Sequence, residues 1–286
     1  MPRILITGCS SGFGRAIALR FLDAGWEVVA TMRRPAPEGL PTSDTLRVMA
    51  LDVTDPHSIS AAVAAAGQID ALVNNAGVGM LNVLEGTGID RARELIETNL
   101  IGTMAMTKAV MPAMRARQSG VIVNISSSVT LRPLPALSIY SASKAAMNAF
   151  TESFALEAAE HGVRARLVLP GSAPETAFGR NAVARMGMDI PQAYARLVET
   201  FLQSLHTAAE KTTALDVADA VWRAVTDPAA PLMLPAGADA ETWFRDRGQP
   251  PRPLPATSNG NGNGNGNGNG NEDRTSPPQP RNRAPR

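Results

Sequence analysis

The feature that most constrains the fold is a glycine-rich turn near the N-terminus, Thr7-Gly-Cys-Ser-Ser-Gly-Phe-Gly14. It follows the apolar run 4–6 and opens an amphipathic stretch at 15–24, so the pattern predicts a strand, a tight turn and a helix. Glycine adopts backbone angles that other residues avoid, and its missing side chain lets a phosphate approach closely. The N–H groups and positive dipole end of the helix then face the anion. The turn therefore predicts a site for a dinucleotide pyrophosphate, with spacing G-x3-G-x-G rather than G-x-G-x2-G.

Short apolar runs alternate with longer helical patterns over roughly the first 245 residues. Buried runs separated by helix-length segments are typical of a parallel sheet covered on both faces, which binds ligands beyond the carboxyl ends of its strands. The sequence therefore predicts one α/β domain over 1–245. The expected strands are 3–7, 27–32, 46–51, 71–74, 121–126, 164–169 and 232–234, and the expected helices are 12–24, 56–66, 90–116, 140–161 and 215–226.

Residues 250–286 differ in composition, because they combine proline-rich stretches with an Asn-Gly alternation from Asn259 to Asn271. Asn-Gly pairs form hairpins when alternating apolar strands flank them, and here none do. A segment without apolar residues cannot offset the entropy of ordering, so we expect a flexible, disordered tail.

Composition and charge argue against several classes of protein. The net charge of +1 gives no global attraction to nucleic acid or to an anionic membrane. No apolar run approaches the ~18 residues of a membrane helix, and the N-terminus does not resemble a signal peptide. The single Cys9 excludes an internal disulfide and suits a reducing cytoplasm. Since His57, His161 and His206 lack ligand spacing, we expect no metal site. From the cysteine count and the apolar runs, we expect a cytoplasmic protein that does not insert into a membrane.

Tyr140 and Lys144 lie four residues apart, on one face of an expected helix. A free phenol has a pKa near ~10, and a fixed cation nearby lowers it by favouring the phenolate. Tyr140 would then donate a proton to a carbonyl oxygen or accept one from an alcohol. The same spacing also occurs on solvated helix faces. However, the chain has only two tyrosines, and this one follows the expected strand 121–126 and its serines, which favours a catalytic role.

Five further motifs stand in order around this pair, and together they resemble those of the short-chain dehydrogenase/reductase family, in its compact rather than its extended branch. They are the glycine turn, Asn74-Asn75-Ala76-Gly77, Asn99 in Glu-Thr-Asn-Leu, Ser127 thirteen residues before Tyr140, and Pro170-Gly171. The resemblance covers roughly 2–235. It implies a Rossmann-type doubly wound parallel sheet of about seven strands, with helices on both faces, in a single domain.

The resemblance also implies four catalytic residues. Tyr140 would exchange the proton, Lys144 would hold the nicotinamide ribose and lower the tyrosine pKa, and Ser127 would hydrogen-bond the substrate oxygen. Asn99 would hold a water that links Lys144 to solvent, or else be a mid-helix residue bonded to backbone. Asn74 and Asn75 either shape the cofactor cleft or merely form a turn. The expected cofactor contacts, besides two arginines described next, are Gly8, Ser10, Ser11, Gly12, Phe13, Gly14, Asp52, Val53, Asn75, Ala76, Gly77, Tyr140, Lys144, Pro170, Gly171 and Thr176.

The residues after the second expected strand indicate which nicotinamide cofactor is bound. NAD-preferring proteins of such folds place an Asp or Glu there to bind the ribose 2′-hydroxyl. This chain has Arg33 and Arg34 instead, and a guanidinium matches a phosphate. A charge-assisted hydrogen bond contributes roughly 1.5–3 kcal/mol, so we expect NADP(H); the alternative is two solvated surface arginines. Asp52 resembles a family residue at the adenine, but it could equally cap the next helix.

Two positions depart from the family pattern. Thr176 is one residue later than the threonine that holds the nicotinamide amide, so either the loop bulges or that contact is lost. Thr130 replaces a glycine often found three residues after the catalytic serine. Neither change touches Ser127, Tyr140 or Lys144.

Three segments are expected to border the substrate: 78–87, 130–139 and 172 to about 213. Their apolar side chains fit a hydrophobic ketone, aldehyde or secondary alcohol, or are ordinary core residues; they include Leu131, Leu134, Leu137, Ile139, Phe178, Met186, Met188, Ile190 and Phe201. The chain's opening resembles that of members acting on steroids or retinoids, which bears on ancestry rather than substrate.

We therefore expect an NADP(H)-dependent oxidoreductase that transfers hydride between nicotinamide and a carbonyl or secondary alcohol of a small molecule. One alternative is a nicotinamide-binding sensor or scaffold without turnover, which the complete Ser127–Tyr140–Lys144 set disfavours. The other is a sugar-nucleotide epimerase or dehydratase of the extended branch, whose G-x2-G-x2-G motif is absent. The resemblance also implies a homodimer or homotetramer, built through 90–116 and 140–161.

Overall fold

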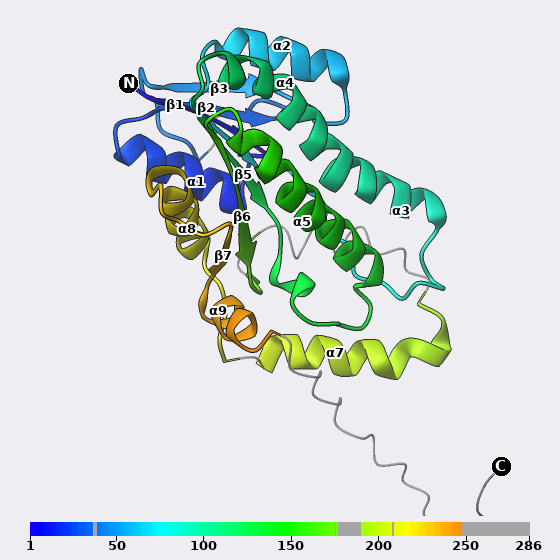
Figure 1. Cartoon of the computed structure of the whole chain (residues 1–286). Coiled ribbons are helices and arrows are strands. Elements are labelled where there is room, and N and C mark those ends of the chain that lie inside the picture. The colour runs from blue at the N-terminus through cyan, green and yellow to red at the C-terminus, as the bar shows by residue number, and fades with distance from the viewer. Residues whose placement is uncertain (37–38, 175, 177–189, 208, 248–286) are drawn as a thin grey trace, which may run out of the picture. The chain divides into compact units, whose positions relative to one another are not determined.

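The structure is a computed structural model that describes residues 1–36, 39–174, 176, 190–207 and 209–247 (Figure 1). These residues belong to one compact unit, Met1–Pro251. The expected tail, 250–286, lies outside the described residues, and so do Phe178, Met186 and Met188.

Seven parallel strands form one sheet in the order β3-β2-β1-β4-β5-β6-β7. The strands are β1 (Arg3–Thr7), β2 (Glu27–Met32), β3 (Leu46–Ala50), β4 (Ala71–Asn74), β5 (Gly120–Ile125), β6 (Val163–Pro170) and β7 (Met233–Ala236). The strand order reverses between β1 and β4, which pair directly with Ile4 beside Ala71. A ligand of such a sheet binds beyond the carboxyl ends of the strands at this reversal.

Helices cover both faces of the sheet, so the predicted Rossmann-type fold is confirmed (Figure 1). The described helices are α1 (Gly12–Asp23), α2 (Pro56–Ala66), α3 (Ile89–Ile96), α4 (Gly102–Ala116), α5 (Ser138–Ala159), α7 (Ala195–Thr207), α8 (Ala214–Thr226) and α9 (Ala238–Arg245). A π-helical turn, Glu97–Ile101, joins α3 to α4, and short 3-10 turns occur at Ser128–Thr130 and Gln192–Tyr194.

Alternating residues of each central strand enter two separate cores. In β1, Ile4 and Ile6 pack with Phe21 of α1 and residues of α8, whereas Leu5 packs on the other face with residues of α2 and α4. This alternation follows from the period of two along a strand. Because both faces are covered, the central strands read as continuous apolar runs, as expected.

The structure differs from the expected elements in three places. The expected helix 90–116 contains the π-helical turn at Glu97–Ile101, so it is not one continuous α-helix. Helix α7 lies within the segment expected to be a loop, and α9 follows β7 without having been predicted. The spacing of Val198, Phe201 and Leu205 is nevertheless that of an amphipathic helix.

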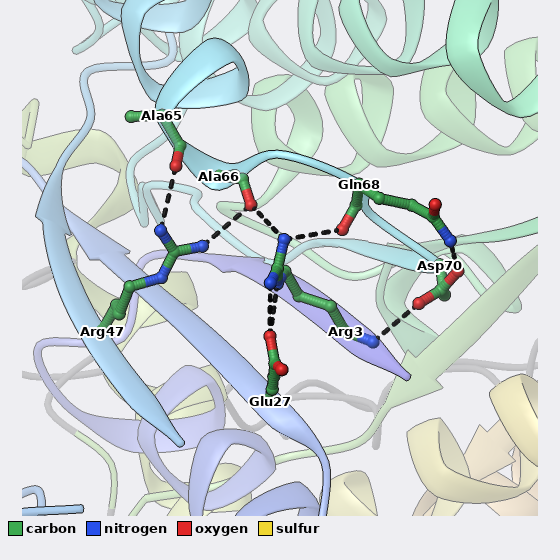
Figure 2. A network of polar contacts seen from close by, with 7 residues as sticks. All are labelled: Arg3, Glu27, Arg47, Ala65, Ala66, Gln68 and Asp70. Atoms are coloured by element: carbon green, nitrogen blue, oxygen red, sulfur yellow. Dashed lines mark hydrogen bonds and ion pairs between the residues drawn. The ribbon is translucent and has the colours of Figure 1, made fainter. Parts of the chain in front are cut away.

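The amino ends of the strands are held by a polar network (Figure 2). The Arg3 side chain donates to the carboxylate of Glu27 at 2.7 Å and to the carbonyl oxygen of Ala66 at 2.7 Å. Arg47 donates to the same carbonyl at 2.8 Å. Two guanidinium groups thus stabilise the carboxyl end of α2. Since the glycine turn follows the other end of β1, this network lies at the edge of the sheet opposite the glycine turn.

Within the described ranges, no helix is both long and apolar enough to cross a bilayer. Among the same residues, no group of three His, Cys, Asp or Glu side chains is arranged to bind a metal ion.

Candidate active site

The glycine turn links β1 to α1, and its glycines are required by the space around them. Gly8 has a φ of +77°, which favours glycine. A methyl group on Gly14 would lie 2.4 Å from the carbonyl oxygen of Gly8 and 2.5 Å from Nδ2 of Asn75. The first turn of α1 therefore packs directly onto the turn that precedes it, as a close-approach glycine in a nucleotide-binding loop allows.

The first turn of α1 offers backbone N–H groups to an anion. Its N-cap, Ser11, makes no side-chain hydrogen bond to the turn, and the turn contains no acidic residue. Ser10 is exposed beside it, whereas the Phe13 side chain packs against the core. The helix end therefore has the free backbone N–H groups that a phosphate site requires, and the Phe13 ring is turned to the core.

The loop after β4 is bonded to this turn through Thr7. The hydroxyl of Thr7 accepts hydrogen bonds from the backbone N–H of Asn75 at 2.9 Å and of Ala76 at 2.8 Å. The Asn75 amide in turn donates to the carbonyl oxygens of Thr7 and Gly8. Asn75 and Ala76 thus fix the two loops at the strand-order reversal against each other.

Asn74, the residue before this loop, is buried and joins two strands to the helix layer. Its Nδ2 donates to Asn124 of β5 at 2.8 Å and to Thr107 of α4 at 3.2 Å. Asn124 then donates to Thr151 of α5 at 2.8 Å. This buried chain of amides and hydroxyls sets the position of α5, which carries the expected catalytic pair.

Ser127 and Tyr140 meet where β5 ends and α5 begins. Ser127 follows β5 and accepts a hydrogen bond from the Val129 N–H, which starts the 3-10 turn. Tyr140 lies in the first turn of α5 and is 8% exposed, packed with Met80 and Leu95. Burial raises the pKa of Tyr140 to about 12, and the hydrogen bond with Ser127 opposes that rise. The two hydroxyl groups therefore lie side by side.

Lys144 lies one helical turn further along α5, and the residue is 4% exposed. Its Nζ donates to the carbonyl oxygen of Ile125 at 2.9 Å. Burial lowers the pKa of Lys144 to about 8. The expectation that this cation holds the Tyr140 pKa below its usual value is not met, because burial of the phenol dominates and raises it.

Asn99 lies in the π-helical turn and holds the loop after β4 in place. Its Oδ1 accepts from the Val78 N–H at 2.8 Å, and its Nδ2 donates to the Val78 carbonyl and to Ser143 of α5. A methyl group on Gly77 would lie 3.2 Å from Oδ1 of Asn99 and 3.7 Å from Nζ of Lys144. Gly77 thus allows Asn99 and Lys144 to converge; the water expected between Lys144 and solvent stays a prediction.

A cavity of about 400 Å³ lies beside the end of β2. Arg33 lines it, together with Thr54 and Val78, while Arg34 is not among the lining residues. The far wall comes from α3 and the π-helical turn, through Arg91, Glu94, Leu95, Glu97 and Thr98. This wall was not predicted, because no local sequence pattern indicates that α3 lies opposite the end of β2.

Asp52 stands near Arg33 and does not cap the next helix. Its carboxylate accepts from the backbone N–H and hydroxyl of Thr54; these bonds, with a smaller contribution from Arg33, lower its pKa. Asp55 caps α2 by accepting from the His57 N–H. Val53 is buried, and a methyl group on Gly102 would meet it at 2.8 Å, so Val53 packs directly against the start of α4.

The turn after β6 reaches back to the glycine turn. Pro170 pairs with Ala236 of β7, and Gly171 follows at the carboxyl edge of the sheet. Thr176 donates to the Ala173 carbonyl at 2.9 Å, and its Cβ would lie 3.6 Å from a methyl group on Gly12. Thr176 is therefore placed beside the glycine turn.

Thr130, which replaces a family glycine, makes two hydrogen bonds through its hydroxyl group. Its hydroxyl donates to the Ser127 carbonyl at 2.9 Å and accepts from the Asn148 amide at 3.0 Å. This threonine therefore braces the segment that follows Ser127.

The three expected substrate segments meet in one apolar cluster. Leu81 and Val83 from the first segment pack with Ala136 from the second and with Val198 and Phe201 of α7. Leu134, Leu137 and Ile190 pack against the same cluster. Some of the expected lining residues are thus core residues of a cluster that α7 helps to build, and Leu137 also packs against the group that contains Tyr140.

Comparisons with known proteins agree with this geometry. A family model described as short chain dehydrogenase matches residues 2–186. An uncharacterized oxidoreductase of Bacillus subtilis, YusZ, is 39% identical over 179 residues, which are 59% of this chain and 64% of that protein. Human retinol dehydrogenase 8 is 36% identical over 199 residues, 65% of this chain and 64% of that protein. The chain thus matches less than two thirds of the length of these relatives.

Solved structures match over most of the chain. A short-chain dehydrogenase from Streptomyces avermitilis has a TM-score of 0.73 at 32% identity and covers 85% of this chain and 90% of its own. A Burkholderia cenocepacia short chain dehydrogenase in complex with NADP has a TM-score of 0.69 at 28% identity, with 86% and 92% covered. A Brucella melitensis 3-ketoacyl-(acyl-carrier-protein) reductase complexed with NADH has a TM-score of 0.67 at 26% identity, with 82% and 96% covered. Because the family model spans residues 2–186, more than half of its length, and these structures match over most of it, the chain belongs to the short-chain dehydrogenase family.

Proposed function

We propose that this oxidoreductase uses NADP(H) to interconvert a carbonyl group and a secondary alcohol on a hydrophobic small molecule. The observation that carries the proposal is the buried Tyr140 phenol, hydrogen-bonded to Ser127 and one helical turn from Lys144, at the same sheet edge as the glycine turn. A proton donor, an oxygen-binding hydroxyl and a dinucleotide-binding turn together serve hydride chemistry at an oxygen-bearing carbon.

The residues present fit a nicotinamide dinucleotide. The turn has no room for side chains at Gly8 and Gly14 and has a positive φ at Gly12, and the first turn of α1 leaves backbone N–H groups for a pyrophosphate. Gly77 and Lys144 would hold the nicotinamide ribose, and Gly171 and Thr176 would border the nicotinamide ring. When bound, the cofactor supplies or accepts the hydride.

The protein's own part in the reaction is to handle the proton. A phenol whose pKa is raised to about 12 stays protonated at neutral pH, so Tyr140 is ready to donate its proton to a carbonyl oxygen. The Ser127 hydroxyl would bind the same oxygen and stabilise the negative charge that develops on it. The buried Lys144 ammonium would stabilise the phenolate that remains after transfer.

The preference for NADP(H) rests on Arg33. Its guanidinium lines the cavity at the end of β2, where NAD-preferring proteins of this fold place a carboxylate. A guanidinium matches the geometry of a phosphate, which only the phosphorylated cofactor carries at this end. The Burkholderia relative holds NADP and the Brucella relative NADH, so the family accommodates both.

The proposed substrate is apolar because Leu137 packs against both the apolar cluster of Leu81, Val83, Ala136, Val198 and Phe201 and the group that contains Tyr140. Burial of apolar area there would stabilise a bound substrate by roughly 25 cal/mol per Å². Human retinol dehydrogenase 8, whose name states an apolar alcohol, is one relative consistent with this substrate class.

We also propose that the protein works in the cytoplasm as a homodimer or homotetramer. Ile101, next to α4, and Leu156 of α5 are 42% and 75% exposed. Both side chains lie in the segments 90–116 and 140–161, where the family resemblance puts the oligomer contacts.

The test is a turnover assay with a pool of hydrophobic ketones and aldehydes, supplied with NADPH or NADH at equal concentration. The proposal expects loss of reduced-nicotinamide absorbance, faster with NADPH than with NADH. Tight binding of NADPH without consumption against a broad pool would instead indicate a protein that binds the cofactor without turnover.

A further inference from the structure

Asp239, which is 5% exposed, places its carboxylate beside the turn that follows β6. One oxygen accepts a hydrogen bond from the backbone N–H of Ser172 at 2.6 Å. The other accepts from the hydroxyl of Thr212 at 2.7 Å. A charge-assisted hydrogen bond to a backbone N–H is among the stronger polar contacts in proteins, so this carboxylate fixes the Ser172 backbone.

Thr212 extends the same network to Gly171. Its hydroxyl accepts a hydrogen bond from the Gly171 N–H at 3.0 Å, and its own N–H donates to the Ser172 carbonyl at 2.9 Å. The hydroxyl has one hydrogen and two acceptors within reach, the Asp239 carboxylate at 2.7 Å and the Ala236 carbonyl at 2.9 Å. Asp239 and Thr212 together therefore bond both residues that follow Pro170.

Gly171 and the Asp239 carboxylate are packed in close contact. A methyl group on Gly171 would lie 2.1 Å from Oδ1 of Asp239, so the carboxylate presses directly against the turn. Asp239 lies in the first turn of α9, where an acid also suits the helix dipole. Both oxygens are nevertheless used by residues 27 and 67 positions away in the chain. The carboxylate thus joins distant segments rather than capping its own helix.

The segment held by Asp239 begins at the carboxyl end of β6 and approaches the glycine turn at Thr176. Its beginning, Gly171 and Ser172, is fixed by α9, and Thr176 lies beside Gly12. The same helix also contacts the segment after Ser127, because the Arg132 guanidinium stacks on the Trp243 ring at 3.6 Å. Burial lowers the pKa of Arg132, and the nearby Asp239 carboxylate opposes that shift.

We propose that Asp239 is a positioning residue that holds the Gly171–Ser172 backbone against the nicotinamide end of the bound cofactor. The proposal rests on the proposed function, since it assumes that a nicotinamide dinucleotide occupies the cleft. Asp239 acts on the shared half of the cofactor, far from the phosphate that distinguishes NADPH from NADH. Its loss therefore weakens both cofactors by the same factor, whereas loss of Arg33 weakens only NADPH.

The experiment measures direct binding of NADPH and NADH to wild type, Asp239→Ala and Asp239→Asn, by calorimetry at fixed salt. Alanine leaves the Ser172 N–H and the Thr212 hydroxyl without their partner, so both affinities should fall about tenfold with their ratio unchanged. Asparagine can accept from Ser172 through its oxygen and donate to Thr212 through its amide. It should restore both affinities to within about threefold of wild type.

Thr242→Ala is the matched control, because Thr242 lies on the same helix and loses only an exposed hydrogen bond to Glu210. It should bind both cofactors like wild type. If Asp239→Ala does not fold, Thr212→Val removes the hydroxyl at nearly constant shape and should weaken both cofactors about fivefold.

Three outcomes distinguish the claims. A folded Asp239→Ala protein that binds both cofactors like wild type would overturn the positioning role, and so would a loss confined to NADPH. Failure of wild type to bind either nucleotide would instead remove the proposed function, and the positioning role with it.

Discussion

The ammonium of Lys144 donates a hydrogen bond to the carbonyl oxygen of Ile125, 2.9 Å away, and so ties α5 to the last residue of β5. Both partners lie in the core of the site, where the cation has little access to water. This contact explains why the lysine is held in place, and burial explains why its pKa falls to about 8.

The first prediction concerns stability and pH. The folded pKa of Lys144, about 8, lies below its ordinary value of 10.5, so the unfolded chain binds more protons between these values and stability rises with pH. Relative to Lys144→Met, wild type should gain roughly 2–3 kcal/mol in free energy of unfolding between about pH 7 and pH 10. Denaturant titrations of both proteins at each pH provide the measurement.

Tyr140 has the opposite effect on stability, so the pH range of this comparison ends at about pH 10. Its folded pKa of about 12 exceeds the ordinary 10.0, so above about pH 10 the unfolded phenol releases its proton first and stability falls. A difference between wild type and Lys144→Met that stays constant from neutral pH to about pH 10 would show that Lys144 titrates normally in the folded protein.

The second prediction tests the packing of the glycine turn. Gly14→Ala places a methyl group 2.4 Å from the Gly8 carbonyl oxygen. The turn must shift, so we expect a loss of about 1–3 kcal/mol in stability and at least tenfold weaker binding of NADPH. Gly88→Ala is the control, because no atom lies within 4 Å of the added methyl group. Equal behaviour of the two variants would remove Gly14 from the cofactor site.

The third prediction separates the two arginines after β2. Arg33 lines the cavity and Arg34 does not, so Arg33→Ala should weaken NADPH binding about ten- to a hundredfold while NADH changes little. Arg34→Ala should have the smaller effect. Titrations with both nucleotides at two salt concentrations would check this, and equal losses of NADPH and NADH in Arg33→Ala would exclude a phosphate contact.

The fourth prediction concerns Cys9, which is 1% exposed and bonds to the Ile6 carbonyl. Burial raises the pKa of its thiol to about 12, so almost no thiolate forms near pH 8. Iodoacetamide should leave the native protein unmodified for hours and label it rapidly in denaturant, as mass spectrometry would report. Rapid labelling of the native protein would mean that the turn around Cys9 opens.

Local patterns predicted the parts of the site that lie close together in the sequence. The turn from Gly8 to Gly14 and the pair Tyr140 and Lys144 each fall within one strand–helix unit, where spacing alone sets which side chains converge. Six of the seven strands start and end within one residue of their expected bounds, because buried parallel strands are continuous apolar runs.

The features of the site that local patterns did not predict depend on contacts between distant segments of the chain. The partners of Asp239 lie 27 and 67 residues away, and no local pattern indicates them. The raised pKa of Tyr140 likewise comes from burial against Met80 and Leu95, which reach it only in the folded chain. Helix α7 is a different case, because its apolar spacing is visible in the sequence although the segment is expected to be a loop that borders the substrate.

The most direct test of the central claim compares wild type with Tyr140→Phe in NADPH consumption with one active ketone from the pool. Phenylalanine keeps the buried ring and removes only the proton donor, so turnover should fall roughly 10²–10⁴-fold. The affinity for NADPH, measured by direct binding, should stay nearly unchanged. Equal turnover in the two proteins would contradict the account, because Tyr140 would then have no part in the transfer of the proton.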